Sequence, residues 1–143
     1  MAGRVAVIGI DIVDVARFRG LLARRPSVLE RLFTPAERAY AEARADPAER
    51  LAARFAAKEA IMKALGAGFG EVAFRDMEVV RPPGGKPGVR LSGRAAVLAR
   101  RAGVVGWHLS LSHSDTAAVA VALAVVPGDA GGATAGETRG APR

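Results

Sequence analysis

The chain of 143 residues contains no cysteine and few aromatic residues. Without cysteine it can form no disulfide bond, no cysteine-ligated metal site and no cysteine nucleophile. Aromatic residues make up only 5% of the chain, whereas hydrophobic residues make up 50%. The core is therefore expected to consist mainly of alanine, valine and leucine, and a chain of this length is expected to form one domain.

A long hydrophobic run is also missing. The apolar N-terminal segment MAGRVAVIGIDIVD is interrupted by Asp11 and Asp14, which fits neither a signal peptide nor a membrane span. We therefore predict a soluble, cytoplasmic protein with no membrane partner. The last segment, residues 127–143, is rich in glycine, alanine and threonine and has no hydrophobic period. It is predicted to be disordered, which leaves residues 1–126 as the folded domain.

Acidic residues are scarce, and the formal net charge is +7. No acid lies between Glu78 and Asp115, a stretch that contains six basic residues: Arg81, Lys86, Arg90, Arg94, Arg100 and Arg101. Such a charge distribution indicates an acidic partner, which can be a nucleic acid, an anionic cofactor or an acidic protein. Composition alone does not choose among the three.

Lysine is rare as well, with three lysines among 21 basic residues. Two of them, Lys58 and Lys63, bracket Glu59 in the segment RFAAKEAIMKALG. Lysine is a compact point charge that binds phosphate, whereas arginine favours planar bidentate pairs. Lys58 also fills the missing position in a stripe of apolar residues at helical spacing, formed by Leu51, Phe55, Met62 and Leu65. This helix therefore places charge against its own core.

Glu59 allows two interpretations. It can form a surface pair with Lys63 at i, i+4 spacing, which stabilises a helix by roughly a few tenths of a kcal/mol. It can also bind a metal, because two carboxylates from separate elements, with waters and substrate phosphates, form the usual Mg²⁺ site. Asp11, at the end of a buried strand, is the candidate second carboxylate, and an internal salt bridge is its alternative. Asp14 is expected to cap the helix that follows it.

Hydrophobic periodicity and capping residues predict an α+β fold. Pro26 divides the first helical segment, Thr34 and Glu37 mark a helix start, and Gly66 ends the long helix. The resulting order, one strand, three helices, two strands, one helix and two strands, predicts an antiparallel sheet packed against the long helix. The expected elements are strand 4–14, helices 15–32, 35–45 and 47–65, strands 71–80 and 89–93, a helix capped by Ser92 and closed by Gly103, and strands 105–112 and 116–126.

The strands are expected to use their faces differently. In the first strand, Val5, Val7 and Ile8 are expected to face the core. In the last strand, alanines alternate with valine and leucine, so both faces are apolar, which suggests burial on both sides, including by another subunit. The segment SLSHSD does not form a Ser-His-Asp triad, because Ser112 and His113 are neighbours on a strand and point to opposite faces. His113 is then either solvated or an anion contact.

Three segments together resemble one known family. GIDIVDVARF, FAAKEAIMKALG and LSLSHSDTAAVAVA look like the signature segments of the holo-acyl-carrier-protein synthases, the small phosphopantetheinyl transferases, in order over roughly residues 7–123. The resemblance implies transfer of the 4′-phosphopantetheine arm of coenzyme A to a serine of an acyl carrier protein, with release of 3′,5′-ADP. It also implies Mg²⁺ as cofactor, a role in fatty-acid or polyketide synthesis, and a homotrimer with sites at subunit boundaries.

The resemblance further implies residue roles. Asp11 and Glu59 hold Mg²⁺ and, with Lys63, form the catalytic set; Lys63 contacts phosphate, and Lys58 is also expected near the phosphates. His113 matches the histidine near the coenzyme A 3′-phosphate. A water polarised by Asp11 or Glu59 is favoured as the acceptor of the serine proton. The acidic carrier protein is expected to dock on the first helix, at Arg17, Arg24 and Arg25. Asp14 stands where many relatives have glutamate and is not assigned to the metal.

Two rival functions are considered. The net charge and the acid-free stretch motivate a nucleic-acid-binding module, but the chain has few aromatic residues and no helix-turn-helix pattern. The other rival is a relative that binds coenzyme A without catalysing transfer. The presence of both acids and the lysines disfavours it.

Overall fold

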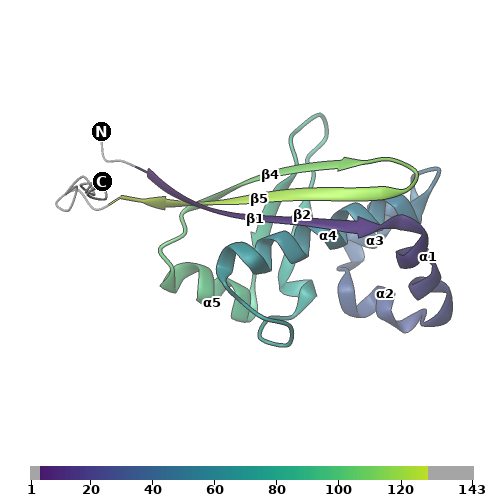
Figure 1. Cartoon of the computed structure of the whole chain (residues 1–143), viewed down its shortest axis with the longest axis horizontal. Helices are drawn as coiled ribbons and strands as arrows, with labels where there is room; N and C mark the ends of the chain where they lie inside the picture. Colours follow the sequence, from purple (N-terminus) through teal and green to yellow (C-terminus); the bar gives the residue numbers. More distant parts are fainter. Residues whose placement is uncertain (1–3, 129–143) are drawn as a thin grey trace, which may run out of the picture.

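The computed structural model describes residues 4–128, so the predicted tail lies outside the described residues except for its first two positions. A three-stranded antiparallel sheet runs along the molecule in the order β1 (Arg4–Asp14), β5 (Ala117–Pro127) and β4 (Gly106–His113). Figure 1 shows the helices gathered along one side of this sheet. A separate antiparallel hairpin consists of β2 (Met77–Val80) and β3 (Gly88–Leu91). The predicted α+β class with antiparallel sheets is confirmed.

The helix boundaries follow the local capping signals. Pro26 separates α1 (Val15–Arg24) from α2 (Ser27–Leu32), as predicted. Thr34 and Glu37 form a complete capping box at the start of α3 (Pro35–Glu42). Asp46 caps α4 (Pro47–Leu65), and Gly66 ends that helix in the left-handed conformation, with φ at 67°, which glycine adopts without steric cost. The remaining helices are α5 (Gly93–Arg101) and the short 3₁₀ helix η1 (Phe74–Asp76).

The long helix α4 packs directly on the sheet. The alanines of β5 that face it, at positions 118, 120, 122 and 124, are fully buried. Gly9 in β1 allows the closest approach, because a Cβ atom at this position would lie 1.8 Å from the backbone oxygen of Ala60. Small residues on the sheet thus bring the α4 backbone against β1, and this contact sets the distance between Asp11 and the side chains of α4.

The outer face of β1 corrects one prediction. Ile8 is 64% exposed and points away from α4 instead of facing the core. Val7 lies on the same side of the strand as Gly9, toward α4, but is still 42% exposed. The side chain of Val5 lies outside the described residues. Ile10 and Ile12 are 59% and 69% exposed and lie on the same outer face as Ile8. The pairing of β1 with β5 places Leu123, Val121 and Val119 beside these three isoleucines. The sheet therefore carries one face buried by α4 and one apolar face that is open in the single chain.

The segment before the hairpin also differs from the prediction. Residues 71–76 were expected to extend the strand, but they form a loop and η1, and only Met77–Val80 pairs as a strand. At the other end, β5 continues through Pro127, one residue beyond the predicted domain boundary. Within residues 4–128, no helix is both long enough and apolar enough to cross a membrane.

Candidate functional site

Asp11 and Lys63 meet where β1 lies against α4. The Lys63 ammonium donates to Asp11 Oδ1 at 2.8 Å and to the Ile10 carbonyl at 3.0 Å. The Asp11 side chain is only 10% exposed, whereas that of Lys63 is 56% exposed. The second oxygen, Asp11 Oδ2, is buried and has no hydrogen-bond partner within the described part of the chain. A buried carboxylate oxygen without a partner is costly, so this place is suited to a further ligand.

Glu59 lies one turn before Lys63 and is half-buried. Burial raises the pKa of Glu59 to about 7, and the nearby carboxylate of Asp11 acts in the same direction, while Lys63 lowers it. Two carboxylates that repel each other in this way share one site. The alternative of a Glu59–Lys63 surface pair is wrong: among residues 4–128 Lys63 pairs with Asp11, and Glu59 forms no ion pair.

Glu59 borders two hollows on the surface. The larger one, about 340 Å³, lies between α1 and α4 and is lined by Arg17, Phe18, Leu21, Arg24 and Phe55, among others. The smaller one, about 80 Å³, is lined by Met62, Lys63, Ala67, Gly68 and Phe69 as well as Glu59. Glu59 can therefore contact one molecule bound in the larger hollow and another bound in the smaller one.

The site fits a divalent cation that is held in part by its substrate. Among the described residues, no group of three or more His, Cys, Asp or Glu side chains is arranged to hold a metal ion. Asp11 and Glu59 provide two carboxylates, and the buried, unpartnered Asp11 Oδ2 is an available ligand atom. Mg²⁺ in proteins is commonly held by one or two carboxylates together with waters and substrate phosphates. The donor set therefore fits Mg²⁺ bound with a phosphate ligand.

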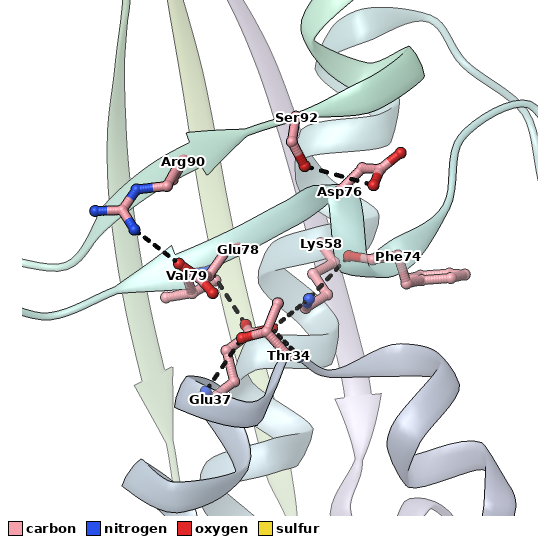
Figure 2. Close-up of polar contacts among 9 residues, drawn as sticks. All are labelled: Thr34, Glu37, Lys58, Phe74, Asp76, Glu78, Val79, Arg90 and Ser92. Atoms are coloured by element: carbon pink, nitrogen blue, oxygen red, sulfur yellow. Dashed lines mark hydrogen bonds and ion pairs between the residues drawn. The ribbon is translucent and has the colours of Figure 1, made fainter.

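Lys58 does not join this site. Its side chain is fully buried, and its ammonium donates to Glu37 Oε1 at 2.6 Å and to the Phe74 carbonyl at 2.9 Å, as Figure 2 shows. At 3.6 residues per turn, Lys58 and Lys63 project from α4 about 140° apart, whereas Glu59 and Lys63 project only about 40° apart. The expected contact between Lys58 and phosphate does not fit this placement. The apolar stripe in the sequence correctly put Lys58 in the core.

Sequence reasoning missed the partner of Lys58. Glu37 was assigned only to the capping box, in which its Oε1 accepts from the Thr34 backbone at 3.0 Å. Its Oε2 also accepts from the backbone N–H of Val79 at 3.1 Å, and Figure 2 shows these contacts drawing α3, α4 and β2 together. A lysine in an apolar stripe requires a buried acid, and this signal could have prompted a search for one.

His113 is the last residue of β4 and lies apart from Asp11 and Glu59 in its contacts. Its Nδ1 forms a hydrogen bond with Glu49, near the start of α4, and its side chain is 25% exposed. No sequence pattern pointed to Glu49. Asp14 caps α1 through a 2.8 Å bond from the Arg17 N–H, as predicted. The strand geometry also agrees with the rejection of a triad, since Ser112 is exposed beside the half-buried His113.

The three arginines expected to bind a carrier protein are all exposed on α1 or at its end. Arg17 and Arg24 line the larger hollow beside Glu59, whereas Arg25 is the residue that follows the last turn. Arg19 lies on the same helix but is bound to Asp46, with its two nitrogens 3.0 and 2.7 Å from the carboxylate oxygens. The structure therefore brings two of the three predicted arginines next to the Asp11–Glu59–Lys63 site.

The sequence and fold can now be compared with known proteins. Residues 7–124 match the sequence profile of the 4′-phosphopantetheinyl transferase superfamily. The chain belongs to this superfamily. The holo-[acyl-carrier-protein] synthase of Moorella thermoacetica is 52% identical over 115 residues, which cover 80% of this chain and 90% of the relative. That of Frankia alni is 48% identical over 120 residues, covering 84% and 97%.

Solved structures of similar proteins show the same fold. A complex of ACPS from Chronobacterium ammoniagenes with CoA has a TM-score of 0.78 and 31% identity and covers 87% of this chain and 99% of that one. The Helicobacter pylori holo-[acyl-carrier-protein] synthase in complex with coenzyme A has a TM-score of 0.71 and 32% identity, with 82% and 98% covered. This phosphopantetheinyl transferase thus carries Asp11, Glu59 and Lys63 at the contact of its first strand with its longest helix.

Proposed function

We propose that this protein transfers the 4′-phosphopantetheine arm of coenzyme A to a serine of an apo acyl carrier protein and releases 3′,5′-ADP. The observation that carries the proposal is the convergence of Asp11, Glu59 and Lys63, two carboxylates and an exposed lysine, at one place between β1 and α4. Membership of the transferase superfamily and the coenzyme A complexes of related synthases support it.

The reaction makes specific demands on the site. The serine hydroxyl oxygen attacks the β-phosphorus of the coenzyme A pyrophosphate and forms a new O–P bond. The bond from this phosphorus to the bridging oxygen breaks, 3′,5′-ADP leaves with the bonding electrons, and the serine proton is released. Catalysis of such a transfer consists mainly of positioning and of neutralising charge on phosphate oxygens.

Lys63 is suited to bind those oxygens. An ammonium group has three N–H donors, and contacts within residues 4–128 use two of them, to Ile10 and Asp11. The third donor belongs to a side chain that is more than half exposed. Because two protein acceptors fix the ammonium, little side-chain freedom is lost when it donates to a phosphate oxygen.

Asp11 and Glu59 are the residues that we propose hold Mg²⁺. A cation bound between them would act as a Lewis acid on the pyrophosphate and relieve the repulsion between the two carboxylates. The Lys63 contact holds Asp11 Oδ1, which orients the buried Oδ2 as the ligand atom. His113, oriented by Glu49, is proposed to contact the 3′-phosphate end of coenzyme A. Lys58 is left out of the site, because it has no exposed surface.

The carrier protein is proposed to dock on α1. Arg17 and Arg24 line the hollow that ends at Glu59, and their charge complements an acidic carrier. The basic residues between Glu78 and Asp115 add to a positive field that attracts both coenzyme A and the acidic carrier protein. A nucleic-acid partner is not part of the proposal, and a cytoplasmic location remains a prediction.

We further propose that the protein is a homotrimer in which the outer face of the β1–β5–β4 sheet is covered by neighbouring subunits. Ile8, Ile10 and Ile12 form a row of exposed isoleucines beside Val119 and Val121 of β5. Contiguous apolar patches of this kind mark interfaces. Light scattering of the wild type and of an Ile10→Glu variant tests this, with a trimer expected only for the wild type.

The test of function is the intact mass of an apo acyl carrier protein after incubation with this protein, coenzyme A and Mg²⁺. The expected result is the gain of one phosphopantetheine, which is lost when EDTA replaces the metal. Retained transfer in EDTA would overturn the metal assignment. If no carrier gains mass although coenzyme A binds, the protein is a coenzyme A-binding relative without transfer. If neither occurs, the proposed function is wrong.

A further inference from the structure

Phe69 is exposed to an unusual degree. Its side chain lies in the loop between α4 and η1 and is 75% exposed, whereas Phe18 and Phe33 are only 3% and 0% exposed. An exposed aromatic ring gives up roughly 2–3 kcal/mol of burial free energy. A single exposed apolar residue needs no explanation, but this one lines the small hollow that contains Glu59 and Lys63.

The ring of Phe69 is held in place at the end of an aromatic row. Its centroid lies 6.3 Å from that of Phe74, which stacks on Phe55 at 5.4 Å. Phe55 in turn stacks on Phe18 at 5.3 Å. The carbonyl of Phe74 also accepts a bond from the buried ammonium of Lys58. The wall formed by Phe69 is therefore supported by the core.

The hollow beside Phe69 is small, and its lining is charged on one side and apolar on the other. Its volume of about 80 Å³ corresponds to roughly two or three water molecules. Glu59 and Lys63 supply a charged side, and Met62 and Phe69 supply an apolar one. A ligand that fits both sides has a charged group joined directly to a compact, branched apolar group.

We propose that Met62 and Phe69 bind the dimethyl-bearing carbon of the arm that coenzyme A donates, and that Phe69 thereby fixes the β-phosphorus for attack. This inference rests on the proposed function and deepens it. In coenzyme A this quaternary carbon is bonded to the CH₂ group that carries the phosphate ester. If Lys63 and Glu59 engage the pyrophosphate, the two methyl groups must lie within a few bonds of them, which is where Met62 and Phe69 line the hollow.

The contact predicts a difference between two ligands. Coenzyme A carries the dimethyl group, whereas 3′,5′-ADP has the nucleotide part without the arm. Burial of two methyl groups contributes about a tenfold change in affinity. Phe69→Ala is therefore expected to weaken coenzyme A binding about tenfold and to leave 3′,5′-ADP binding unchanged.

The experiment is isothermal titration of both ligands, in the presence of Mg²⁺, into the wild type, Phe69→Ala and Phe69→Leu, with Val105→Ala as a control. Val105 is a comparably exposed apolar residue, at 69%, outside this hollow. Phe69→Leu is expected to restore most of the affinity for coenzyme A, and Val105→Ala to change neither ligand. Thermal unfolding establishes that each variant is folded.

The outcomes separate the contact from a general disturbance of the site. A selective loss of coenzyme A affinity in Phe69→Ala supports the proposal. An equal loss for both ligands, or no loss for either, overturns it. Wild-type protein that binds coenzyme A but transfers nothing to any carrier would contradict the proposed function and still allow this binding test. Wild-type protein that does not bind coenzyme A would overturn both.

Discussion

The two lysines of α4 form ion pairs with opposite character. Lys58 and Lys63 each pair with a carboxylate from another element, at 2.6 and 2.8 Å. The side chains of Lys58 and Glu37 are both 0% exposed, and we call them the enclosed pair. In the second pair, Lys63 and Asp11, the lysine is 56% exposed and one aspartate oxygen has no partner among the described residues; we call it the open pair. Similar distances therefore accompany very different surroundings.

The enclosed pair is saturated with contacts. Glu37 accepts bonds from Lys58 and from the backbones of Thr34 and Val79, and Lys58 also reaches Phe74. Burial lowers the pKa of Lys58, which the charge of Glu37 and its hydrogen bond oppose. Both oxygens of Glu37 accept bonds and neither side chain has exposed surface, so this pair is closed to a ligand and joins α3, α4, η1 and β2. In the open pair, Asp11 Oδ2 and one N–H of Lys63 have no partner within the described residues, so they are available to bind a ligand.

The largest expected effect comes from breaking the enclosed pair. Lys58→Ala leaves the Glu37 charge buried without its partner, which costs about 3–5 kcal/mol of unfolding free energy. Urea unfolding measures this loss. The double variant Lys58→Met with Glu37→Leu removes both charges and is expected to recover most of it. A loss below about 1 kcal/mol in Lys58→Ala would show that the pair does not hold these elements together.

Removal of a carboxylate from the site around the open pair, either Asp11 or Glu59, is expected to act on activity instead. Asp11→Ala or Glu59→Ala should lower the transfer rate about 10²–10³-fold, as is typical for a group that stabilises transition-state charge. The control is Thr34→Ala, which removes the helix cap of α3 and lies outside both hollows that Glu59 borders. It is expected to lose about 1 kcal/mol of stability with its helix cap and to keep its activity. Full turnover of Asp11→Ala with Mg²⁺ would contradict the assignment of the site.

The pH dependence of the free energy of unfolding tests the raised pKa of Glu59, the carboxylate next to the open pair. Its folded-state pKa of about 7 lies above its ordinary value of 4.5, so between these values the folded state binds more protons than the unfolded state. Metal-free wild type should therefore lose stability, relative to Glu59→Gln, as the pH rises from about 4.5 to 7.

Urea unfolding of both proteins across this pH range checks the sign. The difference between the two proteins cancels the titration of groups that do not interact with Glu59. Mg²⁺ competes with the proton on Glu59, so its stabilising effect on the wild type should be greater at pH 8 than at pH 5.5. A difference that does not depend on pH would mean that the pKa of Glu59 is not raised in the folded protein.

The smallest expected effect on stability is that of Lys63→Ala. Because Lys63 is 56% exposed, water can replace its ammonium at Asp11, so unfolding free energy should fall by only about 1 kcal/mol, in contrast to Lys58→Ala. Coenzyme A affinity should fall, because the phosphate contact is lost. Arg100→Ala, which removes an exposed cation of α5, serves as a control for general charge. Equal losses of affinity in both variants would argue for a nonspecific field.

Much of the local structure could be predicted from sequence, because its causes are local. Thr34 with Glu37, Asp46 and Gly66 are helix-end signals that act within a few residues, and each predicted helix boundary next to them is observed. The apolar stripe of α4 correctly placed Lys58 in the core. The strand predicted for residues 71–80 is wrong over 71–76, because Phe74 turns in η1 to meet Phe55 and Lys58.

The sequence by itself determined the starts of α3 and α4, the end of α4, the α+β class and the presence of two acids and a lysine suited to phosphate chemistry. Only the tertiary structure decided which carboxylate each lysine meets, because Glu37 lies 21 residues from Lys58 and Asp11 lies 52 residues from Lys63. It also decided which face of β1 is covered. Both faces of that strand carry apolar residues, and α4 lies on the one where Gly9 leaves room for its backbone.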